Sequence, residues 1–217
     1  MRPLGIFGGM FDPIHYGHLR TAHEITEVLD LEAVVFVPAG DPPHRRPPRA
    51  DAATRLAMLR AALADDARFR IDERELRRAG PSWTVPTLEE LRAGHGARPL
   101  VLIVGLDAFA GLATWHRADE LIGLAHLVVA RRPGARLPRT GLPARLLRER
   151  RAGTPREFAR APAGRVWLHE GTRLDVSSSA VRAVVAAGRD PRYLMPEAVR
   201  RIILATGSYA RPPEAEE

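Results

Sequence analysis

Two histidines spaced three residues apart follow a pair of glycines near the start of the sequence. They belong to the string Gly8-Gly9-Met10-Phe11-Asp12-Pro13-Ile14-His15-Tyr16-Gly17-His18. The glycines let the backbone approach a bulky anion because no Cβ is in the way. The helix expected from His18 onward adds free N–H groups and a positive dipole end, both suited to phosphate. His15 and His18 can then point at one phosphoryl group and stabilise charge that develops on phosphorus.

From the residues alone, two other interpretations of this segment stay open. The first is an ordinary Gly-Gly turn, with the histidines as capping or surface side chains. The second is a zinc site at His15-x-x-His18, which is disfavoured because no third ligand of the right kind lies nearby in the sequence.

A run of serines near residue 180 forms a second candidate phosphate site. The run consists of Ser177, Ser178 and Ser179. The first serine directly precedes an expected helix over residues 178–187, and the other two open that helix. Serine commonly caps a helix start, so capping alone would explain the run. Paired with the first string, it becomes a second helix start suited to phosphate. Arg182, one turn into the helix, adds a fixed positive charge.

Apolar runs that alternate with helical segments must position these side chains. The expected strands are residues 4–7, 33–37, 69–71, 100–104, 126–130 and 166–168, and the expected helices are residues 18–29, 52–63 with Asp51 as cap, 85–91, 178–187 and 196–205. This alternation predicts an α/β fold: a Rossmann-like, doubly wound, mostly parallel sheet with helices on both faces. Ligands of such sheets bind beyond the carboxyl ends of the strands, where the Gly8-Gly9 turn falls.

The organisation of the chain is simple. One domain is expected over residues 1–207, with residues 208–217 as a disordered tail. Residues 133–163 are rich in Arg, Pro and Gly and predict an irregular connection with one helical stretch around residues 144–151. His126 lies in an apolar strand and is expected to be a core histidine.

Composition excludes several classes of protein. The 217 residues are 45% hydrophobic and 27% charged, as in a globular domain, and contain no cysteine for a disulfide or a thiolate metal site. No stretch approaches the roughly 18 apolar residues of a membrane helix, and no signal peptide opens the sequence. A cytoplasmic protein without a membrane partner is expected.

The net charge of +7 and the pI of about 11.0 come entirely from arginine, because the sequence has no lysine. A polyanion partner and a GC-rich coding sequence would both explain this excess. A basic nucleic-acid-binding module is disfavoured, since only 6% of the residues are aromatic and no basic face carries interleaved aromatic residues.

The two strings resemble the signatures of a known superfamily. His15-Tyr16-Gly17-His18 is similar to the His/Thr-x-Gly-His motif of nucleotidylyltransferases, and residues 176–182 (Val-Ser-Ser-Ser-Ala-Val-Arg) resemble their Ile-Ser-Ser-Thr-x-Ile-Arg motif. Three further segments are similar to those of bacterial nicotinate-nucleotide adenylyltransferases: residues 41–45 (Asp-Pro-Pro-His-Arg), 81–88 (Pro-Ser-Trp-Thr-Val-Pro-Thr-Leu), and 105–134 with Gly105, Asp107 and Trp115. The resemblance spans roughly residues 4 to 205.

The resemblance implies a role for each matching position. The implied catalytic residues are His15, His18 and Arg182. The implied ligands of ATP and its phosphates are Gly8, Gly9, Met10, Phe11, His18, Gly105, Asp107, Ser177, Ser178, Ser179 and Arg182. The implied ligands of the second substrate are His44, Arg45, Thr84, Trp115, His116 and Arg132. In this scheme Trp115 stacks on a pyridine ring, backbone N–H groups around Thr84 and His116 receive a carboxylate, and Gly105 and Asp107 contact ribose. Taken alone, Trp115 would more simply be a core residue and Asp107 a helix cap.

The implied reaction is transfer of AMP from ATP to nicotinate mononucleotide, giving deamido-NAD and pyrophosphate. Mg²⁺ is expected as the cofactor, bound mainly through ATP phosphates and water, with no metal site built by the protein. Sister transferases for phosphopantetheine or a CTP-dependent substrate, and a dual-specificity enzyme, are the alternatives, and a homo-oligomer stays open. Met10 departs from the family's usual Thr or Ser, but its backbone N–H remains available.

Overall fold

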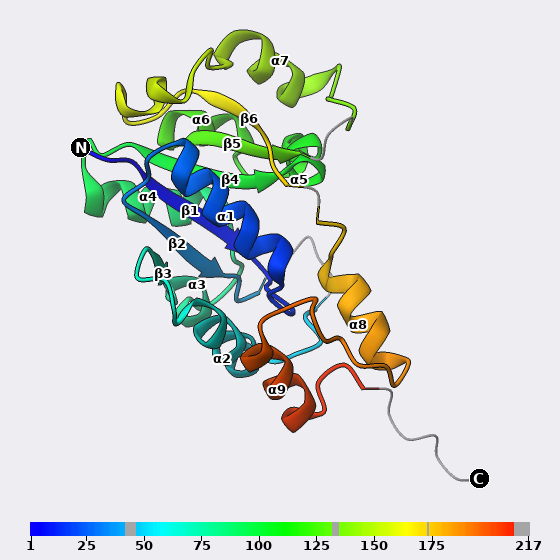
Figure 1. Cartoon of the computed structure of the whole chain (residues 1–217). Coiled ribbons are helices and arrows are strands. Elements are labelled where there is room, and N and C mark those ends of the chain that lie inside the picture. The colour runs from blue at the N-terminus through cyan, green and yellow to red at the C-terminus, as the bar shows by residue number, and fades with distance from the viewer. Residues whose placement is uncertain (42–46, 132–134, 173, 211–217) are drawn as a thin grey trace.

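The computed structural model describes residues 1–41, 47–131, 135–172 and 174–210. Its strands are β1 (Leu4–Gly9), β2 (Ala33–Pro38), β3 (Phe69–Ile71), β4 (Leu100–Gly105), β5 (His126–Arg131) and β6 (Val166–Glu170). Its helices are α1 (Tyr16–Val28), α2 (Ala52–Leu63), α3 (Arg74–Arg77), α4 (Thr84–His95), α5 (Leu106–Ala110), α6 (Leu121–Leu124), α7 (Gly141–Arg150), α8 (Ser178–Ala186) and α9 (Glu197–Thr206), with short 3₁₀ helices η1 (Leu112–Thr114), η2 (Ala118–Glu120) and η3 (Pro155–Ala159). Figure 1 shows the helices arranged around one central sheet.

The six strands form a parallel sheet in the order β3-β2-β1-β4-β5-β6. This is the strand order of doubly wound nucleotide-binding folds, with its reversal between β1 and β4. β1 pairs with β2 as far as Gly9, but its pairing with β4 ends at Ile6. The two central strands therefore part just before Gly8 and Gly9, which opens a crevice at the expected place.

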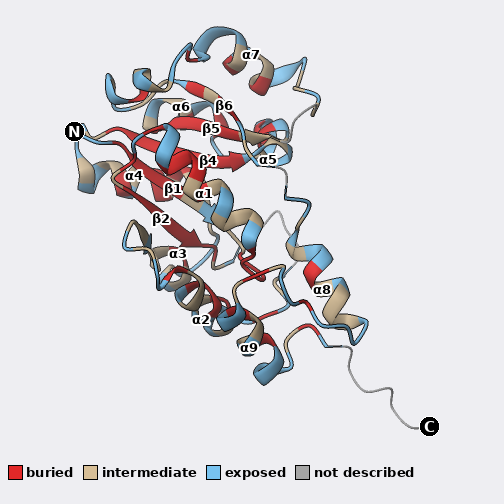
Figure 2. Cartoon of the chain, viewed as in Figure 1, coloured by how far each residue is buried: buried red, intermediate tan, exposed pale blue. Residues whose placement is uncertain are grey.

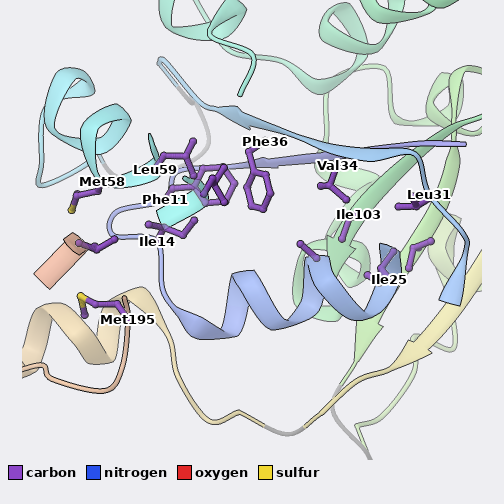
Figure 3. Close-up of a cluster of buried hydrophobic side chains, with 14 of the residues drawn as sticks. Phe11, Ile14, Ile25, Leu31, Val34, Phe36, Met58, Leu59, Ile103 and Met195 are labelled. Atoms are coloured by element: carbon purple, nitrogen blue, oxygen red, sulfur yellow. The ribbon is translucent and has the colours of Figure 1, made fainter. Parts of the chain in front are cut away.

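Alternating side chains of the strands build one core on each face of the sheet. In β2, Val34 and Phe36 belong to one core, whereas Val35 and Val37 belong to the other. Helices α1, α2 and α9 cover the first core, and α4, α6 and α7 contribute to the second. Figure 3 shows Ile25 of α1 near Leu31 and Ile103, and Figure 2 shows the central strands buried. The expected α/β fold with helices on both faces is confirmed.

His126 is fully buried, as expected of a core histidine. Its Nδ1 accepts a hydrogen bond from the Arg165 backbone N–H at 3.1 Å, so Nε2 carries the proton and donates to the Ala161 carbonyl at 2.8 Å. Burial lowers its pKa, which favours this neutral, satisfied imidazole.

Beyond shifts at the ends of predicted elements and the short helices α3, α5 and α6, which were not predicted, two segments differ from the prediction. The helical stretch expected around residues 144–151 is α7, and it begins three residues earlier, at Gly141. The disordered tail expected from Ser208 is wrong for residues 208–210, because Tyr209 is buried and donates a hydrogen bond to Asp12 Oδ1 at 2.7 Å. Residues 211–217 lie outside the described residues. Within the described ranges, no helix combines the length and the apolar character that crossing a membrane demands.

Candidate active site

A cleft of about 1130 Å³ lies at the carboxyl ends of the strands, in the crevice between β1 and β4. It continues past the ends of β5 and β6 toward α8. The predicted site residues that line it are Gly8, Gly9, Met10, Phe11, His15, His18, Gly105, Asp107, Trp115, Ser178, Ser179 and Arg182. The structure thus brings both predicted phosphate motifs and the β4 segment to one cavity.

The two histidines form a stacked pair at the start of α1. His15 is the N-cap residue of the helix, and its ring lies 3.8 Å from that of His18, centroid to centroid, at an angle of 27°. The Nδ1 atoms of both rings are buried and have no hydrogen-bond partner among the described residues. A Cβ at Gly17 would lie 3.0 Å from the His15 ring and 3.3 Å from the Val176 carbonyl oxygen. Gly17 therefore lets the pair lie close to the segment that leads into α8.

Burial keeps the histidine pair uncharged. It lowers the pKa of His15 to about 4. It also lowers the pKa of His18 well below the usual range, and a charge on His15 lowers it further. Two neutral imidazoles that line the cleft offer hydrogen bonds to phosphate oxygens without a fixed charge.

An NMR titration of the free protein should show this directly. The His15 resonance is expected to titrate near pH 4 and to show no transition near pH 6.5, because burial penalises the cation. The unfolded chain takes up protons below about pH 6.5 and the folded one only near pH 4, so stability decreases as the pH falls through this range. A His15 transition at pH 6.5 would contradict the assigned burial.

The serine motif packs directly against the first motif, although more than 160 residues separate them. Ser178 Oγ donates to the Pro13 carbonyl at 2.9 Å. Arg182 donates from Nη1 to the Asp12 carbonyl at 2.6 Å and from Nη2 to Ser179 Oγ at 3.1 Å. Ser177 caps α8 by accepting from the Ala180 N–H at 3.1 Å. The two bonds of Arg182 hold its guanidinium at the edge of the cleft. The bond of Ser177 shows that its side chain serves as the helix cap. Its role as an ATP ligand stays a prediction.

Asp12 is a site residue that the sequence reasoning missed. Its buried carboxylate accepts the backbone N–H groups of Arg49 and Ala50 at 2.9 and 3.1 Å and the Tyr209 hydroxyl at 2.7 Å. Burial, and then the hydrogen bond and charge of Asp12, raise the pKa of Tyr209. Asp12 thereby joins the loop between β1 and α1, the segment after residue 46 and the C-terminal segment. Its place between Phe11 and Pro13 in a glycine-rich string was the available signal.

A second, smaller pocket of about 150 Å³ adjoins the cleft. It shares Gly8, Gly9, Met10, Ile103, Val104 and Trp115 with the cleft. Trp83, Thr84 and His116 line its other side, with the Trp83 and His116 rings 4.9 Å apart. α4 begins here at Thr84, and its N-cap residue Trp83 has an indole, which cannot accept a capping hydrogen bond. The pocket therefore combines a tryptophan face with the N-terminal N–H groups of a helix.

A buried carboxyl group that the sequence reasoning also missed lies in the wall of this pocket. Glu75 Oε1 accepts from the Thr87 hydroxyl at 2.7 Å, and burial raises the pKa of this carboxyl. Glu75 belongs to the Asp-Glu-Arg-Glu run of residues 72–75, in which nothing in the local sequence marks one carboxyl group as buried.

Three predicted substrate ligands, His44, Arg45 and Arg132, lie outside the described residues. Among the residues that are described, no group of three or more His, Asp and Glu side chains gathers where it could hold a metal ion. The zinc interpretation of His15 and His18 therefore finds no third ligand in this part of the chain.

Comparisons with known proteins agree with this geometry. Residues 6–184 match the family model described as cytidylyltransferase-like. Over 209 residues the chain is 46% identical to a probable nicotinate-nucleotide adenylyltransferase of Methylococcus capsulatus, with 96% of this chain and 100% of that protein covered. A protein of the same name from Halorhodospira halophila is 45% identical over 215 residues, covering 98% of this chain and 97% of that protein.

Solved structures show the same fold. The nicotinic acid mononucleotide adenylyltransferase of Plasmodium falciparum, complexed with NaAD, superposes with a TM-score of 0.73 at 14% identity, covering 96% of this chain and 98% of that one. A protein described as a nicotinate-nucleotide adenylyltransferase from Vibrio parahaemolyticus has a TM-score of 0.64 at 16% identity, with 98% of both chains covered. Motifs, strand order and relatives at 45–46% identity over the whole length agree, and the chain belongs to the nicotinate-nucleotide adenylyltransferases within the cytidylyltransferase-like family.

Proposed function

We propose that the protein transfers AMP from ATP to nicotinate mononucleotide, giving deamido-NAD and pyrophosphate. The observation that carries this proposal is that the small pocket opens into the large cleft. A ring-sized pocket with Trp115 and the start of α4 opens into a nucleotide-sized cleft, and Gly8 and Gly9 line both. A pyridine nucleotide whose ring occupies the pocket would place its phosphate beside the histidine pair, where ATP phosphates would also lie.

The chemistry needs little from the protein beyond positioning and charge stabilisation. A phosphate oxygen of the mononucleotide forms a bond to the α-phosphorus of ATP, and the bond from that phosphorus to the leaving pyrophosphate breaks. The attacking oxygen is already anionic at neutral pH, so no general base is required. Neutral His15 and His18 would donate hydrogen bonds to the developing charge, and Arg182 would stabilise the leaving pyrophosphate.

Mg²⁺ belongs to the same proposal. Magnesium keeps several waters and is commonly bound through substrate phosphates with few protein ligands. The site residues suit this mode, since the buried Asp12 carboxylate is already engaged by three hydrogen-bond donors. The ion would neutralise charge on the ATP phosphates.

The proposal also includes a cytoplasmic location, and it takes the two small-molecule substrates as the only partners, without nucleic acid.

A pyrophosphate-release assay tests the proposed reaction, with ATP or CTP against nicotinate mononucleotide, its amide and phosphopantetheine. Release with phosphopantetheine, or only with CTP, would replace the proposal with a sister transferase. A shift of random-sequence DNA at physiological salt would revive the nucleic-acid-binding module.

The acid substrate should be preferred over its amide by about ten- to a hundred-fold, because an amide would leave one buried polar group mispaired. The helix dipole at Thr84 adds to the preference by favouring an anion.

Trp115→Ala should lower kcat/KM for both substrates, by about ten- to a hundred-fold, since ring stacking does not depend on the carboxyl group. Measuring kcat/KM for both mononucleotides in both proteins checks this. Equal values in the wild type would indicate dual specificity, and an unaffected Trp115 variant would make this tryptophan a core residue.

A further inference from the structure

A buried carboxylate on α1 gathers hydrogen bonds from a segment that follows it by about 145 residues. Glu24 accepts the Thr172 backbone N–H at 3.0 Å and the Thr172 hydroxyl, and it contacts His169 Nε2 at 3.2 Å. Arg20 Nε, one turn earlier on α1, donates to the same carboxylate at 2.6 Å. Burial alone would raise the pKa of Glu24, but the bonds from Thr172, His169 and Arg20 outweigh it and lower the pKa to about 2. The group is therefore an anion at neutral pH.

Gly171 packs tightly against this carboxylate. A Cβ at Gly171 would lie only 2.7 Å from Glu24 Oε2 and 3.2 Å from His169 Nε2. The carboxylate is held by several donors, so it cannot move aside without losing them. Gly171 is thus the residue that lets the chain after β6 lie against α1.

His169, Gly171 and Thr172, here called the Thr172 wall, line the large cleft. The wall does not line the small pocket, which lies on the other side of Gly8 and Gly9. Within the proposed function, the pyridine ring occupies the small pocket and the reacting phosphates lie beside His15 and His18. The remaining part of the cleft, over the ends of β4, β5 and β6, is left for the adenosine of ATP.

We propose that Glu24 is a positioning residue for ATP, whose carboxylate fixes the Thr172 wall against which the adenosine part of ATP binds. This inference rests on the proposed function for the placement of ATP. Glu24 would not contact the nucleotide itself. It holds the surface that does, through hydrogen bonds that connect the helix of the histidine pair to the chain after β6.

Two substitutions disturb the same contact from opposite sides. Glu24→Gln keeps the shape of the side chain but turns an NH₂ group toward the donors of the wall, and Gly171→Ala pushes a methyl group into the carboxylate. Thr172→Ser keeps both donors and is the conservative variant. Glu27→Gln is the matched control, because Glu27 is exposed on the same helix and its carboxylate pairs with His23.

The readouts are Kd for ATP by calorimetry, KM for each substrate, and the melting temperature. Glu24→Gln and Gly171→Ala should raise Kd and KM for ATP by about 5- to 30-fold, the range expected when a buried polar contact is mispaired. KM for nicotinate mononucleotide should stay at the wild-type value in both. Glu27→Gln should match the wild type in every binding measurement, and Thr172→Ser, which keeps both donors, should raise Kd for ATP less than Glu24→Gln does.

A fall in melting temperature with unchanged Kd for ATP would overturn the inference and leave Glu24 as a purely structural residue. A parallel rise of both KM values would overturn it as well, since it would show a general distortion of the site. Because Kd for ATP is measured without turnover, it also separates the two proposals. In one outcome, the wild-type protein releases no pyrophosphate with nicotinate mononucleotide while Glu24→Gln still binds ATP more weakly than the wild type. That result would support the role of Glu24 in ATP binding and refute the proposed function.

Discussion

Replacing His18 with alanine is expected to lower turnover by about 10²–10³-fold, the usual cost of losing one hydrogen-bond donor to a transition state. The side chain lies in the cleft at the first turn of α1, stacked on His15. His15 alone would then face the charge that develops on phosphorus. Steady-state kcat with saturating ATP and nicotinate mononucleotide measures the loss.

The same substitution should leave the fold intact. His18 packs edge-on against Phe7 and Phe11, with ring centroids 6.0 and 5.3 Å away. Its removal therefore costs some packing, about 1–2 kcal/mol of unfolding free energy. The control is His23→Ala, five residues further along α1 and outside the cleft. Wild-type turnover in the folded His18 variant would show that the histidine pair is not catalytic.

Arg182→Lys should lower kcat/KM for ATP by about 10²-fold although the positive charge is kept. The guanidinium reaches the Asp12 carbonyl and Ser179 Oγ at the same time. A lysine ammonium is a single point on a flexible stem and cannot keep both contacts while presenting its charge to phosphate.

Arg189→Lys is the matched control, since Arg189 is exposed just beyond the end of α8. Its kcat/KM should equal that of the wild type. If kcat/KM for ATP in Arg182→Lys also equalled the wild-type value, the positive charge alone would matter and the planar geometry of the guanidinium would not. Arg182→Gln, which removes the charge, distinguishes that outcome from an arginine with no role in catalysis.

Local patterns in the sequence predicted the sheet and placed both motifs at helix starts, as the structure confirms. Residues 33–37 form a continuous apolar run stopped by Pro38, and β2 is buried throughout its length. The glycine pair and the histidine spacing placed the loop between β1 and α1 correctly, because residues so close in sequence are constrained by the backbone alone. The serine run likewise opens α8, where Ser177 serves as the cap.

Contacts between distant segments could not be predicted in this way. Nothing near Glu24 in the sequence indicates that Thr172, 148 residues later, will supply its donors. A buried Glu at this point of α1 would even break a simple amphipathic pattern. Trp115 shows the same limit, because only the tertiary fold decides that this ring lines both cavities. Glu75 was missed because its burial depends on Thr87 of α4.

Because Tyr209 reaches Asp12 across 197 residues of sequence, no local segment can complete the loop between β1 and α1. Contacts so distant are slow to form, since closing the loop between them costs entropy before the contact returns any stability. β1, which leads into the loop, also needs a distant partner, with Leu4 aligned with Leu100 of β4. In a refolding experiment, the return of activity would therefore report the docking of the last segment rather than the collapse of the core.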